Sequence, residues 1–226
     1  MKEVMTELKF HVAQADGEVS AILSMPDHAR WVYMFGHGAG AGMRHAFMER
    51  VCHQLADRGI GTFRYQFPHM EYGKKRPDTH RVLHGTVRAA ATAAREAAPD
   101  ARLVAGGKSM GGRMTSLVQA STPLPDVAGL IFLGFPLHAP NKPGNERADH
   151  LRDVAVPMLF LQGTRDSLAD LTLLAPVVSA LGGRATMHIV DGGDHSFKVL
   201  KRSGRTDDDV FDELADTIHT WIESID

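Results

Sequence analysis

The fold of this chain is decided by the stretch R-L-V-A-G-G-K-S-M-G-G-R-M-T-S at residues 102–116. It begins with a short apolar run, Leu103 to Ala105, and continues through two glycine pairs that flank Ser109. Beyond the second pair, apolar residues recur at helical spacing, namely Met114, Leu117 and Val118. This order predicts a buried strand, a sharp turn with Ser109 at its apex, and a helix.

The turn fits the pattern G-x-S-x-G, which places a serine nucleophile on a tight bend between strand and helix. Backbone at such an apex is strained, and side chains two residues before and after the serine would collide, so Gly107 and Gly111 meet the requirement. The first N–H groups of the helix would face the group that Ser109 attacks. A phosphate-binding loop would need glycine where Arg102 stands. An ordinary strand–helix turn stays open on this motif alone.

Composition limits the classes of protein to consider. The chain has 226 residues, 43% hydrophobic and 23% charged, with a formal net charge of -2, which predicts one α/β domain over residues 1–226. This charge gives no electrostatic reason to expect nucleic acid or an anionic membrane as a partner. There is one cysteine, the N-terminus lacks a continuous apolar run, and no stretch approaches about 18 apolar residues. We therefore expect a cytoplasmic protein without disulfides, signal peptide or membrane span.

Predicted strands alternate with predicted helices along most of the chain. Two strands come first, around a turn at residues 15–17, and the later apolar runs are typical of strands buried on both faces. The pattern predicts a mostly parallel, doubly wound sheet with an antiparallel start and helices on both faces. The strands are expected at Thr6–His11, Glu18–Met25, Trp31–Phe35, Ile60–Tyr65, Leu103–Ala105, Val127–Leu133, Met158–Gln162 and Ala185–Val190; the helices at Arg44–Asp57, Asp78–Ala98 with Asp78 as N-cap, after Ser109, Leu168–Leu181 interrupted at Pro176, and Asp207–Ile222; the loops at residues 66–77 and 134–153.

Candidate catalytic residues follow the strands, because ligands bind at the carboxyl ends of parallel strands. Asp166 follows one predicted strand and His195 another, so Ser109, Asp166 and His195 occur in the chain order of α/β-hydrolases. A serine hydroxyl needs a base to become nucleophilic, which His195 would supply, and Asp166 would orient the imidazole. Taken singly, Asp166 could be a turn or N-cap residue, and His195 one of 13 histidines on a surface loop. Asp194 is a rival for the acid, but it neighbours His195.

The small-residue loop at residues 36–42 is expected to help stabilise an oxyanion. Two N–H donors are needed, and Met110 and Ala39 are the candidates. The loop also fits a dinucleotide-binding fingerprint, but Arg64-Tyr65 stands where an acidic residue is expected, so no cofactor is predicted. No metal is predicted either, because the histidines expected near this face show no ligand pair at close helical spacing and Cys52 reads as a core residue. These histidines are His37, His45, His69 and His138.

At this point the sequence resembles the small, capless α/β-hydrolases of the dienelactone-hydrolase kind. More narrowly, it is similar to bacterial proteins related to NSL-complex subunit 3 and testis-expressed protein 30. The similar segments span Phe35–Gly204 and include F-G-H-G-A-G-A-G, F-R-Y, G-G-K-S-M-G-G-R-M, G-F-P-L-H, Q-G-T-R-D and G-D-H-S-F-K-V-L-K-R-S-G. The resemblance implies Ser109, Asp166 and His195 as triad, and Met110 and Ala39 as oxyanion donors. Gln66 departs from it, because proline is expected there.

The segment at residues 134–153, where a cap domain would be inserted, is too short for one. We therefore expect an open or partly roofed site, with Phe135, Leu137, His138 and the 66–76 loop above it. The residues expected to line the pocket are His37, Arg64, Tyr65 and His138. Together with Arg64 and Tyr65, Lys108 and Arg113 could bind an anionic acyl group, although structural ion pairs are the preferred interpretation of these two.

These features predict a serine hydrolase that cleaves a small ester or thioester through an acyl-enzyme. Its partner is then a small-molecule substrate. Two alternatives stay open: a peptidase-like acyl transferase on the same triad, and a protein-interaction module that retains the fold without using the site.

Overall fold

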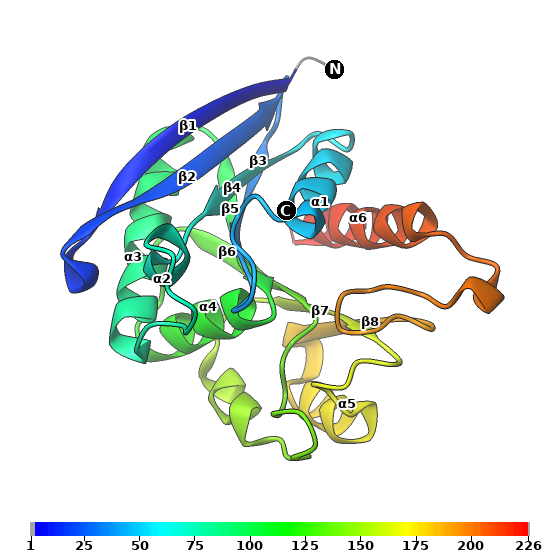
Figure 1. Cartoon of the computed structure of the whole chain (residues 1–226). Helices are drawn as coiled ribbons and strands as arrows, with labels where there is room; N and C mark the ends of the chain where they lie inside the picture. Colours follow the sequence, from blue (N-terminus) through cyan, green and yellow to red (C-terminus); the bar gives the residue numbers. More distant parts are fainter. Residues whose placement is uncertain (1–2, 226) are drawn as a thin grey trace.

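A computed structural model describes residues 3–225 and contains one eight-stranded sheet in the order β1-β2-β4-β3-β5-β6-β7-β8 (Figure 1). The strands β3 to β8 run parallel, whereas β2 pairs antiparallel with both β1 and β4. The predicted sheet with its antiparallel start is thus confirmed. The strands are β1 Glu3–Val12, β2 Gly17–Pro26, β3 Trp31–Gly36, β4 Ile60–Tyr65, β5 Arg102–Lys108, β6 Val127–Leu133, β7 Met158–Gly163 and β8 Ala185–Val190.

The central strands form two cores because alternate side chains point to opposite faces of the sheet. In β3, Val32 and Met34 pack in one core, while Trp31, Tyr33 and Phe35 pack in the other. The first core also contains residues of three helices, α3 (His80–Ala97), α4 (Met110–Ser121) and α5 (Leu171–Ala180). The second contains residues of α1 (Ala46–Ala56) and α6 (Asp207–Ser224). Burial on both faces explains why these strands are apolar throughout instead of alternating with polar residues.

Most helices lie close to their predicted bounds. The α-helices are α1 Ala46–Ala56, α2 Pro68–Glu71, α3 His80–Ala97, α4 Met110–Ser121, α5 Leu171–Ala180 and α6 Asp207–Ser224; the 3-10 helices are η1 Ala13–Ala15, η2 Glu146–Asp153, η3 Gly182–Arg184 and η4 Lys201–Ser203. The short α2 and η2 lie in segments that were predicted as loops. Within residues 3–225, no helix is long and apolar enough to cross a membrane.

Two local predictions about the helices are wrong. The N-cap of α3 is Thr79 and not Asp78, whose carboxylate instead lies 3.4 Å from Lys74 Nζ. The interruption expected in α5 is absent, because Pro176 lies inside a continuous ten-residue helix. Asp78 does not cap the helix because its side chain faces the short α2 instead. There, its Oδ2 lies 3.8 Å from Nδ1 of His69. The prediction of one domain over residues 1–226 stays a prediction, since residues 1, 2 and 226 lie outside the described part.

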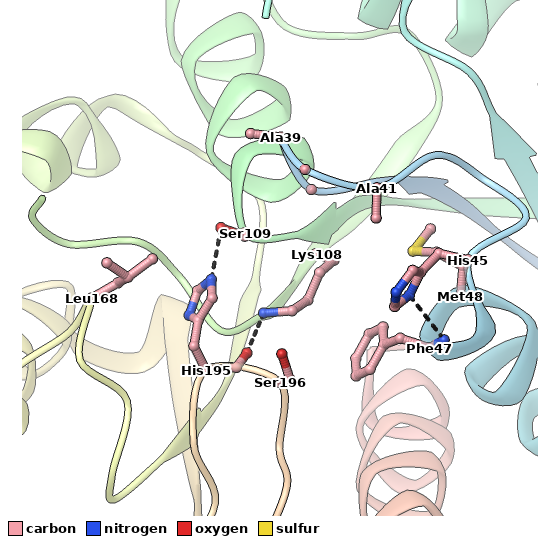
Figure 2. A pocket seen from close by; sticks show the side chains of 12 residues that line it. Ala39, Ala41, His45, Phe47, Met48, Lys108, Ser109, Leu168, His195 and Ser196 are labelled. Atoms are coloured by element: carbon pink, nitrogen blue, oxygen red, sulfur yellow. Dashed lines mark hydrogen bonds between the residues drawn. The ribbon is translucent and has the colours of Figure 1, made fainter. Parts of the chain in front are cut away.

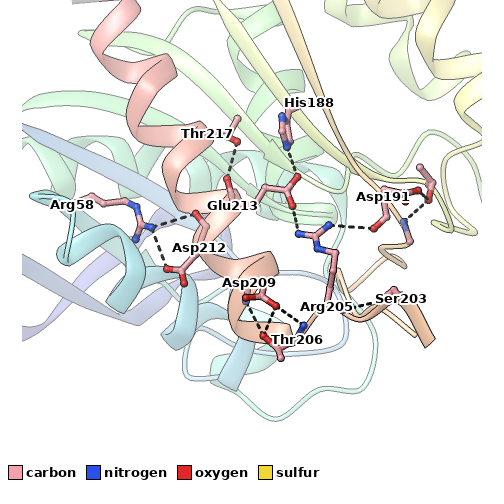
Figure 3. Close-up of polar contacts among 12 residues, drawn as sticks. Arg58, His188, Asp191, Ser203, Arg205, Thr206, Asp209, Asp212, Glu213 and Thr217 are labelled. Carbon is pink, nitrogen blue, oxygen red and sulfur yellow. Dashed lines mark hydrogen bonds and ion pairs between the residues drawn. The ribbon is translucent and has the colours of Figure 1, made fainter. Parts of the chain in front are cut away.

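The C-terminal helix α6 is tied to the rest of the molecule by ion pairs as well as by its apolar face. Arg58 contacts Asp212 (Figure 3) and also Asp216. Glu213 contacts Arg205 and, on the edge strand β8, His188 (Figure 3). The buried face of α6 carries Val210, Phe211, Leu214, Ile218 and Trp221, as the helical spacing predicts.

Candidate active site

Ser109 lies on a strained turn between β5 and α4. Its backbone has φ 49° and ψ −114°, a conformation that a residue with a side chain rarely adopts. A Cβ on Gly107 would lie 2.3 Å from the carbonyl oxygen of Gly36, and a Cβ on Gly111 would lie equally close to it. Both glycines are therefore required because the turn packs directly on the end of β3, as the G-x-S-x-G pattern implies.

The structure brings the three predicted side chains into one chain of hydrogen bonds. His195 Nε2 lies 2.9 Å from Ser109 Oγ (Figure 2), and His195 Nδ1 lies 2.8 Å from Asp166 Oδ2. Each residue comes from a loop after its own parallel strand: β5, β7 and β8. An imidazole placed between a hydroxyl and a carboxylate in this way can remove the hydroxyl proton while the carboxylate stabilises its charged form.

Asp166 is held by two further donors, neither of which the sequence analysis named. Gln162 Nε2 donates to Asp166 Oδ2 at 2.5 Å, and the backbone N–H of Leu168 donates to Oδ1 at 2.8 Å. The orientation of the Gln162 amide is fixed, because its oxygen accepts a hydrogen bond from the Phe135 N–H. Three donors on two carboxylate oxygens suit an ionised acid and leave it little freedom to turn. The sequence feature that could have indicated this role is a glutamine at the end of an otherwise apolar strand, because a buried amide needs hydrogen-bond partners.

Asp194 does not contact the imidazole. Its Oδ1 accepts hydrogen bonds from the backbone N–H groups of Ser196, at 2.8 Å, and Lys198, at 2.9 Å. The backbone N–H of Asp194 in turn donates to the carbonyl oxygen of Lys198. Asp194 therefore shapes the turn that carries His195.

The loop after β3 presents Ala39 beside Ser109 (Figure 2). His37 holds this loop from behind, with Nδ1 2.7 Å from the Gly38 carbonyl oxygen and Nε2 accepting from the Phe67 N–H at 2.9 Å. These contacts fix the tautomer with hydrogen on Nδ1, and burial lowers the pKa of His37 to about 4. Met110 is the first residue of α4, where N–H groups have no partner within the helix. The two predicted oxyanion donors thus lie on the two segments next to Ser109 in space: Ala39 on the loop after β3, and Met110 at the start of α4.

A cavity of about 370 Å³ opens beside Ser109 (Figure 2). Sequence reasoning did not predict most of its walls, although the first turn of α1 follows directly from the glycine-rich loop and so had to lie near it. The cavity is lined by Gly38, Ala39, Gly40, Ala41, His45, Phe47, Met48, Lys108, Ser109, Leu168, His195 and Ser196.

The predicted pocket residues His37, Arg64, Tyr65 and His138 do not line this cavity, and that prediction is wrong. All four are buried behind it: Arg64 donates to the Met43 carbonyl oxygen, Tyr65 packs on Phe67, and His138 Nε2 accepts from the Asp170 N–H. Arg64 and Tyr65 end β4, and His37 and His138 follow β3 and β6, so all four lie at the correct end of the sheet, but their side chains point into the scaffold.

The predicted roof does not line the cavity either. Phe135 and Leu137 belong to the core that contains α4, because the segment at residues 134–153 folds back over that face of the sheet. Gln66, which departs from the family pattern, braces the glycine-rich loop from outside by accepting a hydrogen bond from the Met43 N–H at 2.8 Å. The loop after β4 therefore supports the site without covering it.

Lys108 and Arg113 were expected to form structural ion pairs, and this is not what the described residues show. Neither makes an ion pair within residues 3–225. Lys108 is buried and donates a hydrogen bond from Nζ to the carbonyl oxygen of His195. Burial lowers the pKa of Lys108 to about 8, although the carboxylates of Asp166 and Asp194 oppose part of this shift.

The histidines near this end of the sheet do not assemble into a metal site. Within residues 3–225, no group of three histidine, cysteine or acidic side chains could hold a metal ion. His45 instead accepts a hydrogen bond from the Phe47 N–H and caps α1, and Cys52 is buried on that helix.

Comparison with known proteins agrees with this fold. Residues 29–223 match the model of the α/β hydrolase domain family. A dienelactone hydrolase from Anabaena variabilis is similar in structure, with a TM-score of 0.76, 16% identity and 99% of each chain covered. An α/β serine hydrolase without lid from Xanthomonas campestris has a TM-score of 0.74, 18% identity, and coverage of 96% of this chain and 94% of its own. At these identities the similarity shows that this chain has the same fold as both proteins.

Proposed function

Since this chain belongs to the α/β hydrolase domain family, we propose that it is a serine hydrolase that cleaves a small ester or thioester through an acyl-enzyme. The observation that carries the proposal is the hydrogen-bonded series from Ser109 through His195 to Asp166, with distances of 2.9 and 2.8 Å. A hydroxyl, a base and an orienting acid at these distances can generate a nucleophile at neutral pH.

In the first half of the proposed reaction, His195 Nε2 takes the proton of Ser109 as Oγ attacks the substrate carbonyl carbon. The carbonyl oxygen gains negative charge, which the N–H groups of Ala39 and Met110 stabilise. The bond to the leaving group then breaks, and the alcohol or thiol departs with the proton from His195. An acyl group is left on Ser109 Oγ.

In the second half, water replaces the leaving group. His195 Nε2 removes a proton from the water molecule as the water oxygen attacks the acyl carbon. The bond from this carbon to Ser109 Oγ then breaks, Oγ takes the proton back from His195, and the carboxylic acid leaves. Asp166 stays ionised throughout and stabilises the imidazolium formed in each half.

The cavity beside Ser109 supports a small substrate. Its volume of about 370 Å³ is near the lower end of ligand pockets, and Ala41, Phe47, Met48 and Leu168 give it apolar walls. An uncharged acyl group fits such walls without burying an unpaired polar atom. We therefore place the acyl part of the substrate in this cavity.

The test is covalent labelling with a fluorophosphonate, combined with hydrolysis of p-nitrophenyl butyrate and an S-butyryl thioester. Wild-type protein should label at Ser109, and Ser109→Ala should abolish labelling and lower kcat by about 10⁴-fold or more. Ser121→Ala is the matched control, because this exposed serine ends the same helix. Folded wild-type protein that neither labels nor hydrolyses would refute the proposal and favour the interaction-module alternative.

A further inference from the structure

Lys108 occupies the variable position of the G-x-S-x-G turn, directly before Ser109. It is only 8% exposed, lines the cavity and has no carboxylate within ion-pair distance in the described residues. Its Nζ lies 5.7 Å from the centre of the Phe47 ring and 5.6 Å from that of Phe197. Burying a lysine beside two rings is costly unless its ammonium makes a specific contact.

That contact is with the residue proposed as the base. Lys108 Nζ donates to the carbonyl oxygen of His195, while the neighbouring Ser109 Oγ is hydrogen-bonded to the imidazole of the same residue (Figure 2). Two consecutive residues of the turn therefore hold His195, one by its backbone and the other by its ring. In the described part of the chain, the His195 carbonyl oxygen accepts no other hydrogen bond.

The remaining contacts of the His195 loop do not perform this task. Asp194 closes the turn on itself, and the Arg165 N–H donates to the Gly193 carbonyl oxygen from the loop after β7. Neither links the backbone of His195 to the strand that carries Ser109. The ammonium is also packed closely, since a Cβ on Gly134 would lie 2.9 Å from Lys108 Nζ and 3.4 Å from His195 Nδ1.

We propose that Lys108 is a positioning residue, whose ammonium clamps the His195 backbone to β5 and so keeps the imidazole between Asp166 and Ser109. This inference rests on the proposed serine hydrolase function. Small displacements of a catalytic base lower the rate strongly, because proton transfer requires hydrogen-bond distance. The clamp should therefore affect kcat much more than KM.

The charge on Lys108 gives the clamp a pH dependence. With a pKa of about 8, the amine is an ammonium at neutral pH and becomes neutral as the pH rises, which weakens its hydrogen bond to the carbonyl oxygen. The titratable groups that face it are Asp166, Asp194 and His195, and the other neighbours are the uncharged rings of Phe47 and Phe197. We expect the kcat of the wild type to fall above about pH 8.

The experiment measures kcat and KM for p-nitrophenyl butyrate from pH 6 to 10, after subtraction of the uncatalysed rate. Lys108→Met keeps an unbranched side chain as far as Cε and lacks the ammonium. It should lower kcat about 10- to 100-fold at pH 7, leave KM within about threefold and remove the fall above pH 8. Lys108→Arg stays charged across this range and should retain more activity with a plateau to higher pH. The exposed Lys201→Met is the matched control and should match the wild type.

Three results would overturn the inference: an unchanged kcat and pH profile in Lys108→Met, a rise in KM alone, or an alkaline fall in Lys108→Arg identical to that of the wild type. If Lys108→Met does not fold, the wild type and Lys108→Arg still decide, because a wild-type kcat that is flat to pH 10 also refutes the clamp. Fluorophosphonate labelling separates this failure from that of the proposed function. Labelled Ser109 with no effect of Lys108 refutes only the clamp.

Discussion

At the residue scale, two neighbouring loops bring carboxylates near His195, and only one of them contacts the ring. Asp166 Oδ2 lies 2.8 Å from Nδ1. In Asp166→Asn the shape is kept, but the amide favours the wrong imidazole tautomer, and we expect kcat to fall by about 10⁴-fold. Steady-state hydrolysis of p-nitrophenyl butyrate measures this loss, and circular dichroism checks that the variant is folded.

Asp194→Asn is the companion change with a smaller expected effect. The side-chain oxygen of asparagine can still accept from the N–H groups of Ser196 and Lys198, so the turn that carries His195 is largely preserved. We expect a loss of about tenfold or less in kcat. If Asp194→Asn proved more damaging than Asp166→Asn in folded proteins, Asp166 would not be the acid.

Sequence patterns located these residues because each follows a predicted strand, and parallel strands end at one edge of the sheet. They could not give the direction of a side chain. His37 and His138 follow strands in the same way, yet both rings point into the scaffold and bond to backbone groups. Gln162 was missed for the opposite reason, because it continues an apolar strand. Its role depends on Asp166, four positions later, and also on Phe135, which lies 27 positions earlier and reaches it only when the chain folds.

At the element scale, α6 begins with a capping box that the structure defines fully. Thr206 Oγ1 accepts from the Asp209 N–H at 3.1 Å, and Asp209 Oδ2 accepts from the Thr206 N–H at 2.7 Å (Figure 3). Thr206→Ala removes the first bond, and we expect it to lower the free energy of unfolding by about 1 kcal/mol. Urea denaturation followed by circular dichroism measures the change.

Thr220→Ala is the matched control in the same helix. Thr220 is exposed and lies inside α6, where alanine is the better helix former, so this change should raise stability slightly or leave it unchanged. Equal destabilisation by both substitutions would show that the loss at Thr206 is not due to the cap.

Strands were easier to predict than caps because their signal is repeated over several residues, whereas a cap depends on one side chain. The run from Trp31 to Phe35 is buried on every residue and admits no other interpretation in an alternating chain. Asp78 is a favourable N-cap type, yet it lies beside Lys74 and His69 because the short α2 turns the loop back toward it. Such a contact between loop and helix has no local sequence pattern.

At the scale of the whole molecule, the candidate site lies where the winding of the sheet reverses. After β3 the chain passes through α1 to β4 on one side of β3, whereas after β5 it passes through α4 to β6 on the other side. The segments that follow these two neighbouring strands therefore leave the sheet in opposite directions (Figure 1). Crevices at such switch points bind ligands in open α/β sheets. The glycine-rich loop leaves β3 and the Ser109 turn leaves β5, which explains why residues about 70 positions apart form one site.

The whole molecule should also lose stability in mild acid because it buries neutral histidines. Burial lowers the pKa of His37 and of His150 to about 4, and the positive charge of Arg113 contributes at His150. In the unfolded chain a histidine takes up a proton near pH 6.5, so between pH 6.5 and 4 the unfolded state binds more protons than the folded one. Stability is therefore complete above pH 6.5 and falls as the pH drops toward 4.

For the fully buried His37 the expected loss is on the order of 2 kcal/mol between pH 7 and pH 5. Urea titrations at the two values measure it, with His37→Gln to remove the proton site while an amide oxygen still accepts from the Phe67 N–H. The pH dependence should be smaller in His37→Gln by about that amount, whereas His53→Gln on the exposed face of α1 should leave it unchanged. Equal pH dependence in the wild type and His37→Gln would mean that folded His37 accepts a proton, which its contacts with Gly38 and Phe67 do not allow without moving the loop beside Ser109.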